Sequence, residues 1–211
     1  MPTGMYDGNM SAQTVKQPDL TRDRLLAAAF AEIHRNGYQA ASLASILADT
    51  GLTKGALYHH FPDKKALGLA VVDEMIRPRL ADMMFAPLRG AEHPLAAMID
   101  LLRRKAKNTK GEEIALGCPL NNLMQEMSPI DEDFRRGLNR LLQDWVKVVA
   151  EALRRGQEGR EVRQDIDAQE TAFFIVASIE GCLGMSKNTQ SPGAYRGCLA
   201  QLGRYLEGLK A

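Results

Sequence analysis

The amino-acid sequence of 211 residues predicts an all-α protein, and three observations lead to this fold class. Apolar side chains recur at steps of three and four residues along most of the chain, which is the spacing of one helix face. Runs of alternating Val, Ile and Thr bounded by turn pairs, the pattern of strands, are absent from the sequence. With 45% hydrophobic and 25% charged residues, the composition is typical of a globular protein. The apolar runs fall far short of the ~18 residues that cross a bilayer, so we expect no membrane partner.

The N-terminal arm and the cysteines both bear on the compartment in which the protein works. Residues 1–19 carry prolines, glycines and polar side chains but no apolar stretch of the signal-peptide type, so we expect a flexible arm on a cytoplasmic protein. The cysteines are odd in number, far apart and without a Cys-x-x-Cys pair, which argues against a disulfide framework and a zinc site. We therefore expect no metal or other cofactor, and reduced, partly buried thiols at Cys118, Cys182 and Cys198.

Three short helices are predicted after the arm. Thr21 can cap the first helix, which stops at Gly37. The second helix begins at Ser42 and ends at Gly51, where the chain can turn with a positive φ. Thr53 then offers a new cap only two residues further on, so the third helix follows almost at once.

A longer helix is predicted next, after the break at Phe61-Pro62-Asp63. It runs to about Met84 and contains Pro78, so we expect a kink or a break near Arg77 that could act as a lever between the two halves of the chain. The same periodicity predicts further helices over residues 94–107, 118–127, 134–153, 173–183 and 195–209.

The last two predicted helices are candidates for a dimer interface. The first of them is apolar on more than one side, so it must be covered twice, and the second has the four-three-four-three steps of a seam against a neighbouring helix. The predicted interface residues are Phe174, Leu183, Tyr195, Leu199, Leu202 and Leu206. The pattern fits one large monomeric core equally well, and this alternative stays open.

Residues 42–60 have the layout of a helix-turn-helix, in which the second helix crosses the major groove of DNA. Lys54 opens that helix, and the small residues Gly55 and Ala56 let its first turn approach base edges closely. Side chains that can grip phosphates surround it, namely Thr53, Tyr58, His60 and Lys64. The whole chain has a formal net charge of only +1, so specific affinity must come from two copies of the site on one duplex.

Residues 21–72 resemble the N-terminal DNA-binding domain of the TetR/AcrR family of transcriptional regulators. The resemblance rests on Thr21-Arg22, Asn36-Gly37-Tyr38, the run from Gly51 to Phe61, and then Lys64, Leu67, Ala70 and Val71. Residues 117–127 are similar to a motif in one branch of the family. The resemblance implies a homodimer with a DNA-binding domain over 20–65 and a helical ligand-binding and dimerisation domain over 66–211. It also implies base contacts at Lys54, Gly55 and Ala56, and phosphate contacts at Ser42, Thr53, Tyr58, His60 and Lys64.

A pocket that senses a small molecule needs an apolar lining with a few polar groups. The candidates in the C-terminal half are Met84, Asn122, Gln125, Glu126, Phe134, Trp145 and Phe173. For the polar members a helix cap or a solvated face is the alternative role, and for Phe134 and Trp145 it is core packing.

The sequence therefore predicts a ligand-responsive transcriptional regulator, most simply a repressor, and none of the enzyme motifs that we searched for occurs in it. Its expected partners are double-stranded DNA with a pseudo-palindromic operator, an unidentified small-molecule inducer and a second copy of the chain. An activator remains open. Two alternatives from other classes also remain open: an all-α small-molecule or lipid carrier without DNA binding, and a thiol-based redox-sensing regulator.

Overall fold

The structure is a computed structural model that describes residues 19–211, so nearly all of the predicted arm lies outside the described part. Within the described range the chain is all-α, as predicted, with one isolated bridge between Val162 and Lys210. None of the helices in this range combines the length and the hydropathy that a bilayer crossing requires.

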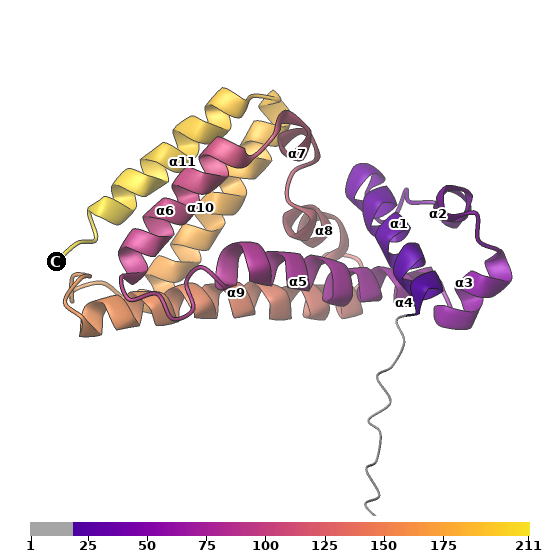
Figure 1. The fold of residues 1–211 in the computed structure, drawn as a ribbon, viewed down its shortest axis with the longest axis horizontal. Helices are drawn as coiled ribbons and strands as arrows, with labels where there is room; N and C mark the ends of the chain where they lie inside the picture. Colours follow the sequence, from indigo (N-terminus) through magenta and orange to yellow (C-terminus); the bar gives the residue numbers. More distant parts are fainter. Residues whose placement is uncertain (1–18) are drawn as a thin grey trace, which may run out of the picture.

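The N-terminal unit contains the three predicted short helices, α1 (Leu20–Asn36), α2 (Leu43–Thr50) and α3 (Lys54–His60) (Figure 1). Their shared core contains the fully buried Leu25, Ile46 and Leu57, one from each helix. The predicted cap of the first helix is wrong. The Asp19 carboxylate, and not the Thr21 hydroxyl, accepts the hydrogen bond from the backbone N–H of Arg22 at 3.2 Å.

The predicted long helix forms without a break at Pro78. It is built from α4 (Lys64–Ala70), the π-helical η1 (Val71–Ile76), α5 (Arg77–Leu80) and the π-helical η2 (Ala81–Phe85), which follow one another directly. The backbone N–H of Arg77 donates to the carbonyl of Val72, five residues back, so the turn that precedes the proline is wide. A wide turn absorbs the missing N–H of the proline without ending the helix.

The C-terminal part is a bundle laid against a long helix. Its elements are α6 (Pro94–Asn108), α7 (Gly111–Leu116), α8 (Pro119–Met127), α9 (Glu132–Glu158), α10 (Ala168–Thr189) and α11 (Pro192–Glu207). In Figure 1, α9 runs beside α5, while α6, α10 and α11 form a layered group at the end away from the N-terminal unit. Only α7 has no counterpart in the sequence prediction, because six residues are too few to show a period.

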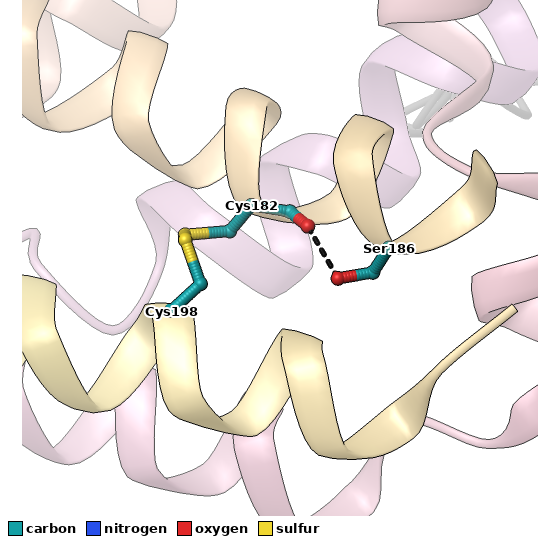
Figure 2. Close-up of a disulfide and its surroundings, with 3 residues drawn as sticks. All are labelled: Cys182, Ser186 and Cys198. Atoms are coloured by element: carbon teal, nitrogen blue, oxygen red, sulfur yellow. Dashed lines mark hydrogen bonds between the residues drawn. A yellow bond between two sulfur atoms is a disulfide. The ribbon is translucent and has the colours of Figure 1, made fainter. Parts of the chain in front are cut away.

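The expectation of three reduced thiols is wrong for two of them. Cys182 of α10 and Cys198 of α11 form a disulfide, with a Cα–Cα distance of 5.5 Å (Figure 2). The two helices are joined by a short turn and pack side by side, so residues 16 apart in sequence meet across the hairpin. Neither a short spacing nor an even number of cysteines marks these two residues as disulfide partners in the sequence. One turn after Cys182, the Ser186 hydroxyl donates to the Cys182 carbonyl at 2.7 Å, and Cys118 remains a free thiol.

Candidate DNA-binding and ligand-binding sites

The α2–α3 pair is fixed by a hydroxyl cap at the start of each helix and by a glycine at the end of α2. The Ser42 hydroxyl accepts from the backbone N–H of Ala44 at 3.1 Å, and the Thr53 hydroxyl accepts from that of Ala56 at 3.2 Å. Gly51 ends α2 with φ +65, a conformation that favours glycine. Each hydroxyl uses an oxygen lone pair as a cap and keeps its own hydrogen to donate.

The outer face of α3 is open to solvent. Lys54, Gly55 and Tyr58 are exposed, together with the capping Thr53, while Ala56 is half-buried. Among residues 19–211, the Lys54 ammonium takes part in none of the ion pairs. The structure therefore brings the predicted base-contacting residues together on one accessible face at the start of a helix.

Two predicted phosphate-contacting residues also make contacts within the protein. The Lys64 ammonium donates to the carbonyl of Gln39 at 3.0 Å and lies 4.9 Å from the centre of the Tyr38 ring. His60 Nδ1 lies 3.5 Å from a carboxylate oxygen of Asp19. Both groups therefore have positions defined by the fold before any DNA is present.

The N-terminal unit is attached to the C-terminal part by hydrogen bonds just before α8 and near the end of α8. At one end, His34 Nε2–H of α1 donates to the Gly117 carbonyl at 2.8 Å, and burial lowers the pKa of this imidazole. At the other end, the Glu126 carboxylate accepts from the backbone N–H groups of Tyr38 and Gln39, both at 2.8 Å. The stretch from Gly117 to the end of α8 is thus hydrogen-bonded to the last turn of α1 and to the residues that follow α1.

Further contacts close the same boundary between the two parts of the protein. The rings of Tyr38 and Phe134 pack with their centres 4.6 Å apart. Lys65 bridges Asp131 and Asp133 at the start of α9, with nitrogen–oxygen distances of 2.9 and 2.6 Å. Hydrogen bonds to Asp133 and Asp131 raise the pKa of Lys65, so its charge is retained at neutral pH.

A cavity of about 500 Å³ lies in the C-terminal part. Its wall is mostly apolar and is formed by the long helix, by α6, α7, α9, α10 and α11, by the segment around Cys118, and by one face of α1 from the N-terminal unit. Among its lining residues, Glu180 and Tyr195 are buried, and Trp145 is 2% exposed. Burial raises the pKa of Glu180 to about 7 and raises that of the Cys118 thiol far above its usual range. The volume lies within the range of small-molecule sites.

The residues predicted for the ligand pocket fall in several places. Met84 and Trp145 line the cavity just described. Asn122 donates to the Leu116 carbonyl at 2.8 Å and accepts from Lys187, and Gln125 is exposed. Those two residues and Glu126 line a second, more polar hollow of about 470 Å³ beside α1. Phe134 packs on Tyr38, and Phe173 is 53% exposed on the outside of α10.

Sequence reasoning missed Glu180, Cys118 and Tyr195 as cavity residues. Glu180 could have been recognised from the sequence, because it is the one charged residue within the mainly apolar stretch from Ala172 to Leu183. Cys118 and Tyr195 carry no comparable signal, since only the packing of helices distant in sequence brings them to the same wall.

Most of the predicted dimer-interface residues are buried inside the subunit. Tyr195, Leu199, Leu202 and Leu206 are at most 5% exposed, in the layer where α11 packs on α6 and α10. The seam pattern of α11 therefore reports the core, and this part of the interface prediction is corrected. Leu183 is half-buried. The apolar side chains that remain exposed on these two helices are Phe173, Phe174, Met185 and Tyr205.

Comparison with known proteins matches both parts of the structure. Residues 94–202 match the tetracyclin repressor-like C-terminal domain, and residues 25–71 match the bacterial regulatory proteins of the tetR family. This chain belongs to the TetR family. It is a helix-turn-helix transcriptional regulator with an all-α fold, as the resemblance in its sequence implied.

Individual TetR-family relatives align over most of the chain. An uncharacterized HTH-type transcriptional regulator in the lacX 3′ region of Lactococcus lactis subsp. lactis is 35% identical, over 81% of this chain and 85% of that protein. The HTH-type transcriptional regulator LmrA of Bacillus subtilis (strain 168) is 32% identical, over 79% and 86%. The crystal structure of regulatory protein TetR from Rhodobacter sphaeroides aligns with a TM-score of 0.78 at 26% identity, over 88% of this chain and 98% of that chain.

Proposed function

We propose that this protein is a homodimeric repressor that binds a pseudo-palindromic operator and leaves it when a small molecule occupies the 500 Å³ cavity. The observation that carries the proposal is the exposed N-terminal face of α3, where Lys54 follows the hydroxyl cap of Thr53. A relative from Mycobacterium sp. (strain GP1), 29% identical over 70% of this chain, is named as the HTH-type transcriptional repressor DhaR. The proposed dimer places two copies of α3 ~34 to 36 Å apart, or a multiple of that, in successive major grooves.

Base and phosphate contacts divide between the residues of this face. Lys54 and the small Gly55 and Ala56 meet base edges, because only a slim first turn lets the backbone lie deep in the groove. The residues on either side of this turn donate hydrogen bonds to phosphate oxygens of the DNA backbone. They are Ser42, Thr53, Tyr58, His60 and Lys64. The capping hydroxyls suit this role, since their hydrogens are free to donate to phosphate oxygens.

A salt series of gel shifts on the DNA that flanks the gene tests this division. We expect Lys54→Ala to reduce the preference for the operator over unrelated DNA, and Lys64→Ala to weaken binding on every sequence and lower the salt slope by about one. Lys147→Ala is the matched control, because it removes an exposed lysine from α9. Equal loss of sequence preference in both test variants, or no operator binding by the unaltered protein at low salt, contradicts the proposal.

Thermal melting of the same proteins is needed to interpret the Lys64 result. This side chain also holds the Gln39 carbonyl, so its removal loosens the segment before α2 as well as a phosphate contact. If Lys64→Ala lowers the salt slope of DNA binding but leaves the melting temperature unchanged, the lost contact is the one to a DNA phosphate.

Release of DNA requires that ligand binding favours a geometry in which the two recognition helices no longer fit the groove spacing. Helix α8 provides one route, because Cys118 and Pro119 at its start line the cavity while Glu126 near its end holds the Tyr38–Gln39 backbone. The long helix provides a second route, since Met84 lines the same cavity and α4 of this helix belongs to the boundary with the N-terminal unit.

A thiol-responsive regulator is the second candidate, and the Cys182–Cys198 disulfide favours it. The bridge links the two helices that carry the exposed apolar side chains, so its reduction would loosen the proposed dimer surface. Operator affinity measured with and without a thiol reductant tests this candidate. It predicts a difference for the unaltered protein and none for Cys198→Ser, whereas equal affinities in both conditions exclude it.

A further inference from the structure

Three buried polar atoms without hydrogen-bond partners belong to side chains that line the same cavity. In the described part of the chain, four buried side-chain polar atoms lack a partner, and three of these are Trp145 Nε1, Glu180 Oε2 and the Tyr195 hydroxyl oxygen. All three side chains line the 500 Å³ cavity, and they come from α9, α10 and α11. Buried polar groups in proteins are nearly always paired, because an unpaired one loses its hydration without compensation. A group of unpaired atoms around one cavity therefore indicates the polar end of a ligand.

The hydrogen-bonding capacity of each atom follows from its chemistry and protonation. The indole N–H of Trp145 can only donate. Burial raises the pKa of Tyr195 to about 12, although the nearby Thr109 side chain acts in the opposite direction, so the phenol keeps its proton and can donate. The Glu180 carboxyl is the only buried acid among the lining residues, and the neighbouring Cys118 thiol stays protonated. The buried lining groups are thus two donors and one carboxyl. The other charged side chains of the wall are the exposed Arg79, Lys110, Glu112 and Glu113 and the half-buried Lys105.

We propose that this cavity binds a neutral, mostly apolar small molecule whose polar end is a hydroxyl group held by Trp145, Glu180 and Tyr195. The hydroxyl oxygen accepts from the Trp145 N–H and the Tyr195 O–H, and its hydrogen is donated to the Glu180 carboxylate. All three atoms then have a partner, while the apolar body of the ligand fills the remaining wall. This inference rests on the proposed function, since it names the ligand class of the cavity assigned to the inducer.

Charged end groups complement the site less well. A protonated amine can donate to Glu180, but it has no lone pair and leaves the Trp145 N–H without a partner. A carboxylate accepts from both donors and meets the half-buried Lys105 in the wall, but it is repelled by Glu180 in its ionised form, so its binding is linked to protonation of Glu180. A hydroxyl fits in either protonation state of Glu180, because its hydrogen can be donated to the carboxylate or to the carbonyl oxygen of the carboxylic acid.

A set of 2-substituted naphthalenes tests the end group while the apolar body stays constant. The four probes are naphthol, methoxynaphthalene, naphthylmethylammonium and naphthoate, titrated calorimetrically into the full chain at neutral pH. Naphthol donates and accepts, the methyl ether only accepts, the ammonium only donates, and the carboxylate accepts with a negative charge. We expect naphthol to bind most tightly, by about fivefold over the ether, which is the weight of one neutral hydrogen bond.

Three substitutions assign the effect to named atoms. Glu180→Leu is expected to abolish the advantage of naphthol over its methyl ether, because the acceptor of the naphthol hydrogen is gone. Trp145→Phe and Tyr195→Phe each keep the ring and remove one donor, so both are expected to weaken naphthol by about fivefold. Tyr205→Phe is the matched control, since it makes the same chemical change at a partly exposed tyrosine outside the cavity.

Melting temperatures without a probe separate a ligand role from a structural one. Deleting an unpaired buried donor is expected to leave the free protein as stable as before or more stable, whereas deleting a structural hydrogen bond would destabilise it. For Tyr195→Phe the inference therefore predicts weaker probe binding and a melting temperature of the free protein that is unchanged or higher. A lower melting temperature together with unchanged naphthol affinity overturns it.

The outcome for this inference is independent of the outcome for the proposed function. Tighter binding of naphthoate or naphthylmethylammonium than of naphthol, or no binding of any of the four probes, overturns the hydroxyl assignment even when the gel shifts show a specific operator complex. Preference for naphthol with no operator binding leaves the cavity assignment intact and removes the proposed repressor function.

Discussion

The carboxylate of Glu126 holds the backbone of the segment that positions α2. In the sequence it lies in an amphipathic stretch beside methionines, where a ligand contact and a solvated face were both open. The fold brings it against the N–H groups of Tyr38 and Gln39, nearly ninety residues earlier, with both distances at 2.8 Å. Hydrogen bonds to a charged acceptor are stronger than neutral ones. This side chain is thus one of the links between the C-terminal part and the N-terminal unit.

Replacing Glu126 is expected to weaken this connection. Glu126→Gln removes the charge and one of the two acceptor oxygens, so we expect a loss of about 1–3 kcal/mol in the free energy of unfolding and weaker operator binding, because the α2–α3 pair is held less firmly. Urea denaturation and gel shifts measure the two effects. Gln125→Ala is the control, since the side chain of that exposed neighbour donates its hydrogen bond within α8, to Asn121. Wild-type stability and affinity for Glu126→Gln would show that the connection lies elsewhere.

At the scale of elements, the close approach of α4 to its neighbours depends on a glycine. A Cβ atom added to Gly68 would lie 2.5 Å from a carbon of the Tyr38 ring and 2.8 Å from one of the Phe134 ring. Such distances are far below van der Waals contact, and both rings belong to the boundary between the two parts of the protein. The packing of α4, α9 and the segment after α1 therefore requires a residue without a side chain at this position.

Alanine substitutions at two helical glycines test this requirement. Gly68→Ala is expected to destabilise the protein by about 1–3 kcal/mol through overpacking. Gly203→Ala in α11, where an added Cβ would meet nothing within 4 Å, is expected to stabilise it by about 0.5–1 kcal/mol. Denaturant midpoints of both variants measure the difference. Two stabilised variants would mean that the rings move aside at little cost.

Periodicity and capping chemistry predicted most of the elements, and the exceptions have physical reasons. The third helix has the predicted beginning, Lys54, because Gly51 and Thr53 leave little freedom in where it starts. Asp19 replaces Thr21 as the first cap because several residues there can cap a helix, and only the tertiary position of the chain selects one. The disulfide and the short α7 were not predictable, since neither follows from local sequence.

The candidate sites were predictable to different extents for a related reason. The DNA-binding face comes from one continuous segment, so its residues could be chosen together from the sequence. The cavity draws on helices separated by more than a hundred residues, so only Met84 and Trp145 of its predicted members line it. Helical periodicity reports which side chains are buried, but it does not report which buried side chains meet.

For the whole molecule, the proposed function requires a second copy of the chain. A single subunit presents one α3, whereas the proposed operator needs two, so dimerisation must contribute much of the affinity. The apolar side chains left exposed on α10 and α11 are the natural contact, with Phe173 and Phe174 more than half exposed and the ring of Phe174 packed on Tyr205.

A charge placed on this surface is expected to separate the subunits. Phe174→Glu should give a monomer in light scattering after size-exclusion chromatography, with operator affinity reduced roughly 100-fold or more because bivalent binding is lost. Ile130→Glu is the control, since it changes an equally exposed apolar side chain before α9. A dimer that persists in Phe174→Glu, with full affinity, would assign the contact to another surface.

The bridge between Cys182 and Cys198 also makes the C-terminal hairpin a closed covalent ring. The turn inside that ring is solvent-facing, with Gln190 exposed and in the left-handed backbone region at φ +51. A protease that nicks the chain there would therefore release no fragment: the two pieces would migrate as one band on a gel until a reducing agent separated them.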